Sequence, residues 1–131
     1  MSAPAKSLAG TWEMIHAEFA GEKAPEFVIL KTEVEFTDLE YVVRFAGETA
    51  DRGTYALDLT GTPPALTLTG VEGPNAGRTI PCLFQLAGDR LRVCYGLDGG
   101  VPTVFATAAD AQRYLATYRR KPPAVTPGGE R

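Results

Sequence analysis

Residues 82–95 read CLFQLAGDRLRVCY, and this stretch decides the fold. Gly88 and Asp89 give a two-residue turn between two runs in which apolar residues alternate with other residues, which is the pattern of a β-hairpin. The register that this turn sets pairs Cys82 with Tyr95, Phe84 with Val93, and Leu86 with Leu91. The stretch therefore predicts two neighbouring antiparallel strands that share one apolar face.

The hairpin holds both cysteines of the chain, and its register separates them. Cys94 is the neighbour of Tyr95, which pairs with Cys82, so the Cys94 side chain points to the opposite face of the sheet. We therefore expect no disulfide between the two thiols. Free, packed cysteines are typical of a reducing cytoplasm.

The same period of two continues along the chain and predicts an all-β protein. Strands are expected at residues 8–19, 31–37, 40–45, 53–59, 65–69, 78–86, 90–95 and 112–119. Eight strands joined by short turns most naturally close into an antiparallel up-and-down barrel, because closure removes exposed edges. A sandwich is the structural alternative.

The connections hold little regular structure. No segment keeps apolar residues at helical spacing over three turns, so no long helix is expected. Residues 26–30 form either one helical turn or a loop, and residues 46–52 a polar loop. A short extra strand is expected at 104–106 and a helical turn at 108–111.

Length and composition indicate one globular domain. The chain has 131 residues, of which 44% are hydrophobic and 22% charged. We divide it into an N-terminal extension (1–7), a barrel domain (8–120) and a tail rich in proline and glycine (121–131). We expect that tail to be disordered.

The net charge and the lengths of the apolar runs indicate which classes of partner and which location to expect. Thirteen Lys and Arg against 16 Asp and Glu give a net charge of −3, which argues against a nucleic-acid-binding protein. No apolar run approaches the length of a membrane span or a signal peptide. We therefore expect a cytoplasmic protein with no membrane partner. A second copy of the chain is a partner that the sequence leaves open.

A series of short motifs resembles a known group of barrels. Gly10-Thr11-Trp12 resembles the Gly-x-Trp signature of the lipocalin and calycin superfamily. From residue 8 to residue 120 the chain more closely resembles a lipocalin-like bacterial domain family of planctomycete type, whose function is uncharacterised. The ordered motifs that carry this likeness are LAGTWE (8–13), GTY (53–55), EGPNAGRT (72–79), GDRLRVC (88–94) and YRR (118–120).

The resemblance implies an eight-stranded barrel that can enclose a central cavity, and it implies no particular ligand. In lipocalins the signature tryptophan packs near the closed end of the barrel, beneath an arginine from the end of the last strand. Trp12 matches that tryptophan, and Arg119 or Arg120 matches the arginine. We take Gly10, Trp12 and Arg119 as the structural signature.

Inward-facing side chains of the predicted barrel are the candidates for contact with a ligand. They are His16, Phe36, Tyr41, Phe45, Tyr55, Phe84, Tyr95, Tyr114 and, at the end of the last strand, Tyr118. Tyrosine offers apolar area together with a hydroxyl group that can orient a ligand. Because a barrel of eight strands is either filled by its side chains or just wide enough for one small ligand, both outcomes stay open.

His16 is expected on the same face as Trp12, as a structural residue or a ligand contact. A lone histidine without a second ligand at metal spacing gives no metal site, and no haem or other cofactor is expected. Most carboxylates fall on the outward face. Serine occurs only at positions 2 and 7, and a Cys–His pair would have to reach across the barrel. No catalytic residue is therefore proposed.

The sequence favours non-catalytic binding of a small, largely apolar molecule in the barrel. Apolar burial would supply the affinity, and one or two hydrogen bonds would orient the ligand. The alternative is a filled barrel that serves as a protein-interaction module. An enzyme that uses the cavity is the third and least favoured hypothesis.

Overall fold

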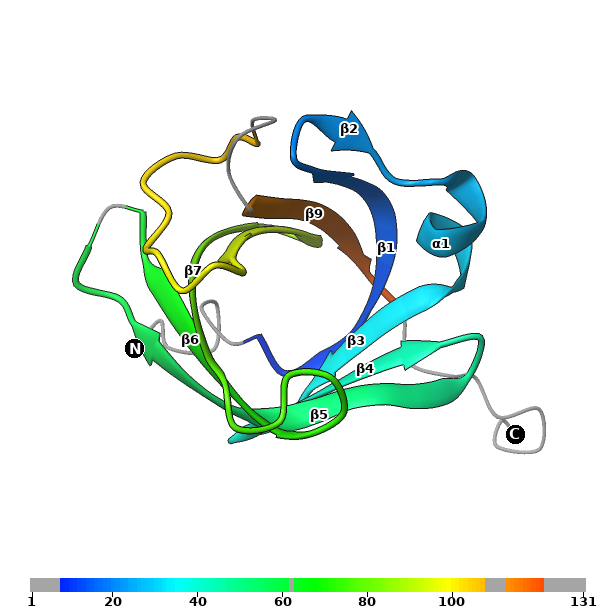
Figure 1. Ribbon diagram of the computed structural model, residues 1–131, viewed down its shortest axis with the longest axis horizontal. Coiled ribbons are helices and arrows are strands. Elements are labelled where there is room, and N and C mark those ends of the chain that lie inside the picture. The colour runs from blue at the N-terminus through cyan, green and yellow to red at the C-terminus, as the bar shows by residue number, and fades with distance from the viewer. Residues whose placement is uncertain (1–7, 62, 108–112, 122–131) are drawn as a thin grey trace.

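The strands wind into a closed antiparallel barrel in the computed structural model, which describes residues 8–61, 63–107 and 113–121 (Figure 1). Each strand pairs with the next along the chain, and the last pairs back with the first. The barrel strands are β1 (Gly10–Phe19), β3 (Thr32–Phe36), β4 (Glu40–Phe45), β5 (Glu48–Asp58), β6 (Ala65–Glu72), β7 (Thr79–Ala87), β8 (Arg90–Gly96) and β9 (Arg113–Arg120). The predicted eight-stranded up-and-down barrel is confirmed, and the β1–β9 pairing excludes the sandwich.

Two small elements lie outside the barrel wall between β1 and β3. The two-residue strand β2 (Glu22–Lys23) pairs with the end of β1, and α1 (Glu26–Lys31) follows it. Of the two alternatives predicted for residues 26–30, a helical turn or a loop, the structure shows the helix. Ile29 is the one buried side chain of α1, and it joins the hydrophobic core. None of the helices in the described part of the chain has the length and apolarity that crossing a membrane requires.

The predicted hairpin is confirmed residue by residue. Cys82 pairs with Tyr95, Phe84 with Val93, and Leu86 with Leu91. Both cysteines are free and buried.

The sequence prediction is wrong at two connections. Residues 46–52 were predicted to be a loop, but β5 begins at Glu48. Residues 104–106 form no strand. The extension predicted for 1–7, the helical turn for 108–111 and all of the predicted tail except Lys121 lie outside the described residues.

A β-bulge in β1 reverses which side chains face the barrel interior. The pairing of β1 with β9 shifts between Met14 and His16, so Ile15 is an extra residue without an opposite partner. Before the bulge Trp12 and Met14 face inward, and after it Ala17 does. A strict alternation through this strand would have pointed His16 inward instead.

One end of the barrel is closed by Trp12. Its ring is fully buried, and its Nε1–H donates a hydrogen bond of 2.9 Å to the carbonyl oxygen of Leu8. The Arg120 guanidinium lies over the ring, 4.3 Å from its centroid. Gly10 suits this end because its φ is 124° and a Cβ there would come within 3.2 Å of the Arg120 guanidinium.

Arg119, which we assigned to the structural signature, does not take that place. In β9 the inward positions include Tyr118 and Arg120, so the residue between them points outward. Arg119 pairs there with Glu13 at 2.8 Å. Arg120, the other of the two candidates, is the arginine that lies over the Trp12 ring.

Candidate functional site

The half of the barrel away from Trp12 encloses a cavity of about 340 Å³. Aromatic rings form much of its wall, and aliphatic side chains of β1, β3, β4, β6 and β7 form the rest. The aromatic lining residues are Phe36, Tyr41, Tyr95, Tyr114 and Tyr118. A cavity of this size lies near the lower end of the range for small-molecule sites, roughly 300–1,000 Å³.

Two loops contribute to the cavity at its open end. Pro74 and Asn75 come from the loop between β6 and β7, which curls over the end of the barrel in front of β5 (Figure 1). Leu97 comes from the loop after β8. Arg78 ties the two loops together, because its guanidinium donates hydrogen bonds to the side-chain oxygen of Asn75 and to the carbonyl oxygen of Leu97.

A carboxylate stands in this otherwise uncharged wall. Asp51 of β5 is 8% exposed and pairs across the sheet with the inward-facing Val43. Its Oδ2 accepts hydrogen bonds from the Tyr41 hydroxyl at 3.3 Å and from the Asn75 amide at 3.0 Å. Its Oδ1 is buried and has no hydrogen-bond partner among the described residues. A buried polar atom without a hydrogen bond lowers the stability of the folded state by about 1–3 kcal/mol. The presence of an unpaired carboxylate oxygen here therefore calls for an explanation.

Phenol groups supply the remaining polar atoms of the cavity. The hydroxyls of Tyr95 and Tyr118 are 2.7 Å apart, and the Tyr114 hydroxyl lies 3.7 Å from the Met14 sulfur. Burial raises the pKa of Tyr95 well above its ordinary value, and burial is also the main cause of the raised pKa of Tyr118. These hydroxyls therefore stay protonated at neutral pH and can both donate and accept hydrogen bonds.

Four of the predicted contact residues line the cavity, namely Phe36, Tyr41, Tyr95 and Tyr114, and so does Tyr118. Tyr55 does not, because its ring packs edge-on against Phe36 and its hydroxyl donates to the Thr37 carbonyl oxygen at 2.5 Å. Phe84 is buried in the core outside the cavity lining. Phe45 is 37% exposed at the end of β4.

His16 also lies away from the cavity, contrary to the expectation that it faces inward with Trp12. The bulge at Ile15 turns it to the outer face, where its Nε2 lies 3.0 Å from a carboxylate oxygen of Glu18. The hydrogen bond from His16 is the largest cause of the lowered pKa of Glu18. His16 is thus part of a half-exposed surface pair.

Asp51 and Asn75 are the polar residues that sequence reasoning missed. The signal for Asp51 was present, because counting back by twos from Leu57 through Tyr55 and Gly53 reaches Asp51. The polar composition of residues 46–52 concealed it. Asn75 lies in the turn EGPNAGRT, whose sequence predicts a turn but not the direction in which it folds.

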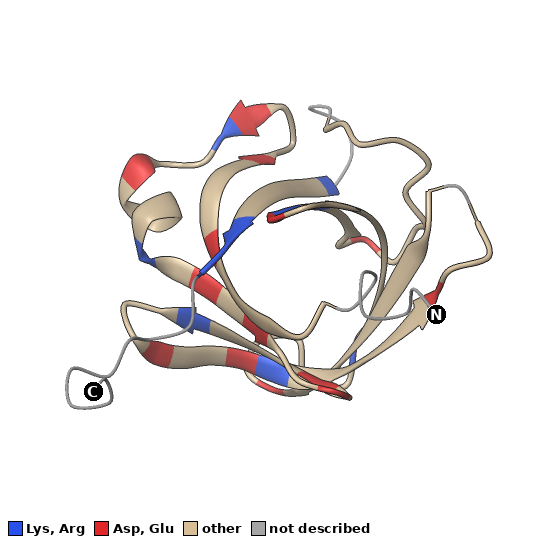
Figure 2. Ribbon diagram, turned by 180° about the vertical axis from the view of Figure 1, so that it is seen from behind, with Lys and Arg blue, Asp and Glu red and all other residues tan. Residues whose placement is uncertain are grey.

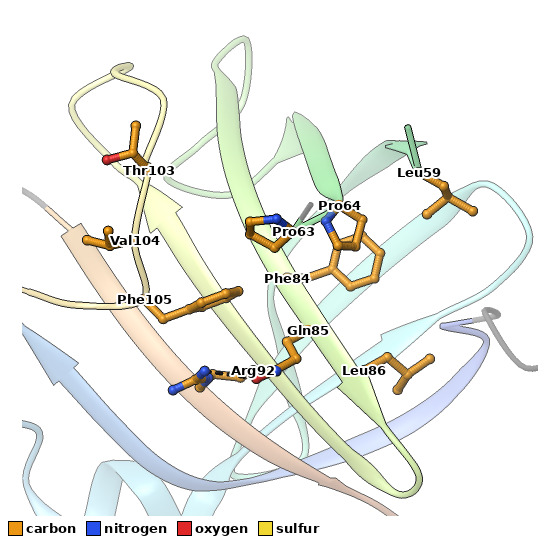
Figure 3. A pocket seen from close by; sticks show the side chains of 10 residues that line it. All are labelled: Leu59, Pro63, Pro64, Phe84, Gln85, Leu86, Arg92, Thr103, Val104 and Phe105. Carbon is orange, nitrogen blue, oxygen red and sulfur yellow. Dashed lines mark hydrogen bonds between the residues drawn. The ribbon is translucent and has the colours of Figure 1, made fainter. Parts of the chain in front are cut away.

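A second hollow of about 570 Å³ lies outside the cavity, between β7, β8 and two loops (Figure 3). Leu59 and Val104 expose apolar surface there, and Pro63 and Pro64 lie between them on the near side of β7 (Figure 3). The Arg92 guanidinium lies 4.4 Å from the centroid of the Phe105 ring.

Charged side chains of both signs are interspersed around the wall rather than gathered on one face (Figure 2). Several form ion pairs across neighbouring strands, such as Arg44 with Glu35 at 2.8 Å and Arg119 with Glu13 at 2.8 Å. Within residues 8–61, 63–107 and 113–121, no three His, Cys, Asp or Glu side chains group closely enough to hold a metal ion.

Comparisons with protein-family models, with curated proteins and with solved structures find no match for this chain.

Proposed function

We propose that this protein binds a small, largely apolar molecule in the barrel cavity without transforming it. The observation that carries the proposal is the division of the barrel into a half closed by Trp12 and a half with a cavity of about 340 Å³. Apolar and aromatic walls supply burial, and the few polar atoms at Tyr41, Asp51 and Asn75 converge on one side. That combination is typical of sites that bind ligands by burial and orient them by a few hydrogen bonds.

Native mass spectrometry of the gently purified protein, compared with its denatured mass, tests for a bound molecule directly. We expect an added mass that is lost on denaturation. The neutral apolar fluorophore N-phenyl-1-naphthylamine provides a second readout, because its emission rises when it enters an apolar cavity.

A pair of variants locates the site. Val43→Phe places extra volume in the cavity, whereas Val42→Phe adds the same volume on the outer face of the same strand. We expect Val43→Phe to lose most of the fluorophore binding and Val42→Phe to keep it, with cooperative unfolding in both. Equal binding of the fluorophore by the two variants would show that it binds outside the barrel. The alternative hypothesis, a protein-interaction module, would then be favoured over ligand binding. The hollow beside Phe105 would be its candidate interaction surface.

A further inference from the structure

The charges in the cavity wall indicate which ligands it can accept. Among the described residues that line it, Asp51 is the only charged side chain, and no Lys, Arg or His joins it. Arg78, the guanidinium in the same hydrogen-bond network, is directed to Asn75 and to Leu97. A ligand that carries a carboxylate or a phosphate would therefore meet a like charge with no cation in the cavity wall to balance it.

The same surroundings suit a cation. In the part of the chain that the structure describes, Asp51 Oδ1 has no hydrogen-bond partner. Its Oδ2 accepts a hydrogen bond from the Asn75 amide and a long one from the Tyr41 hydroxyl. Five aromatic rings line the cavity, and the faces of aromatic rings attract ammonium groups. A protonated amine would supply the hydrogen-bond donors and the opposite charge that this buried carboxylate lacks.

We propose that the molecule bound in the barrel is a small amine with an apolar body, and that Asp51 receives its ammonium group. This inference rests on the proposed function and adds the chemical class of the ligand. The apolar body lies among the rings of Tyr95, Tyr114 and Phe36. The ammonium group lies beside this carboxylate, which no cationic side chain among the described lining residues balances.

The loop between β6 and β7 covers one side of the carboxylate. A Cβ on Gly73 would come within 2.9 Å of Asp51 Oδ1, so this loop passes directly over the oxygen. Gly73 has a φ of 94° at this crossing.

Three probes with the same phenyl body test the proposal. These are 2-phenylethylamine, 2-phenylethanol and 3-phenylpropionate, which are cationic, neutral and anionic at pH 7. Calorimetric titration of the full chain should show the amine binding about ten- to a hundredfold more tightly than the alcohol, the range for a charge-assisted hydrogen bond. The propionate should bind most weakly.

Two variants assign the preference to the carboxylate. Asp51→Asn keeps the shape and removes the charge, and it should bind the amine and the alcohol equally. Asp58→Asn removes an exposed carboxylate from the same strand and should keep the full preference. Tyr41→Phe removes one donor from Asp51 Oδ2 and should increase the preference. It stands in for Asp51→Asn if that variant fails to fold, and an unchanged preference would then count against the carboxylate.

The outcomes separate this inference from the proposed function. Binding of all three probes without preference, or preference for the propionate, would overturn the amine while leaving a binding cavity. An amine preference that survives in Asp51→Asn would overturn the role of the carboxylate. If no probe binds and no bound mass is found by native mass spectrometry, both proposals fail.

Discussion

Trp12 shows how a single side chain closes one end of this barrel. Its ring is fully buried, its N–H is satisfied by the Leu8 carbonyl oxygen, and the Arg120 guanidinium covers its face. A buried indole N–H without an acceptor would be costly, so the hydrogen bond to the Leu8 carbonyl oxygen helps to keep the ring buried. The cation–π contact adds about 0.5–2 kcal/mol, since it is partly shielded from water.

Replacing Trp12 with alanine should therefore lower the free energy of unfolding by about 3–5 kcal/mol, the range for emptying a large buried aromatic site. Urea unfolding followed by circular dichroism measures the change. Phe27→Ala, at a ring that is 60% exposed on α1, is the matched control and should stay within about 0.5 kcal/mol of wild type. A near-zero effect of Trp12→Ala would mean that the ring does not close the barrel.

At the scale of the element, the bulges in β1 and β5 decide which side chains reach the interior. Each bulge inserts one residue and changes the phase of the strand. In β1 the extra residue places Ala17 inside and His16 outside. In β5 the pairing shifts at Ala50, and Asp51 then faces inward opposite Val43.

Deleting Ile15 tests this account of β1. Without the extra residue the strand regains regular pairing, and Met14, His16 and Ala17 keep the faces they have now. We expect the variant to fold and to unfold cooperatively on heating. Deleting Arg92 is the control, because β8 has no bulge at that position and every later side chain of the strand would change face. Similar loss of folding in both variants would contradict the assignment of Ile15 as a bulge residue.

Across the whole molecule, closure of the sheet buries four tyrosines from three strands, β4, β8 and β9, around one interior. Burial raises the pKa of Tyr41, Tyr95, Tyr114 and Tyr118 above the ordinary value of 10.0. Desolvation of the phenolate is the main cause in each case. A phenol of the unfolded chain, which water surrounds, ionises near that ordinary value.

These shifts predict a loss of stability at alkaline pH. The folded state keeps the phenolic protons that the unfolded state releases, so the stabilisation is complete below pH 10.0 and falls as the pH rises above it. The melting temperature should therefore fall as the pH rises above about 10. The double variant Tyr95→Phe/Tyr118→Phe should drop less steeply. Parallel curves for the two proteins would show that these hydroxyls do not control the alkaline transition.

The sequence predicts the barrel because its inward-facing positions are apolar with a period of two, as in the hairpin around Gly88. It does not predict Ile15 or Ala50 as bulge residues, because a bulge depends on pairing with a strand far away in the chain. The aromatic part of the cavity was predictable from alternation alone, as Tyr41 and Tyr95 show. Alternation counted back from Leu57 also reaches Asp51, but its polar neighbours resemble a loop, and its burial depends on the turn that brings Asn75 over it.

The side chains of the two cysteines lie on opposite faces of the barrel wall. Their reactivity toward a thiol reagent therefore reports on two different opening motions of the protein. Cys94 faces outward beneath the segment after β8, with its sulfur 3.9 Å from the Ala106 carbonyl oxygen. Cys82 faces the interior. A thiol reagent reaches Cys94 once that outer segment lifts, but it reaches Cys82 only when the strands themselves part. The order in which the two sulfurs are labelled thus distinguishes local opening from global unfolding.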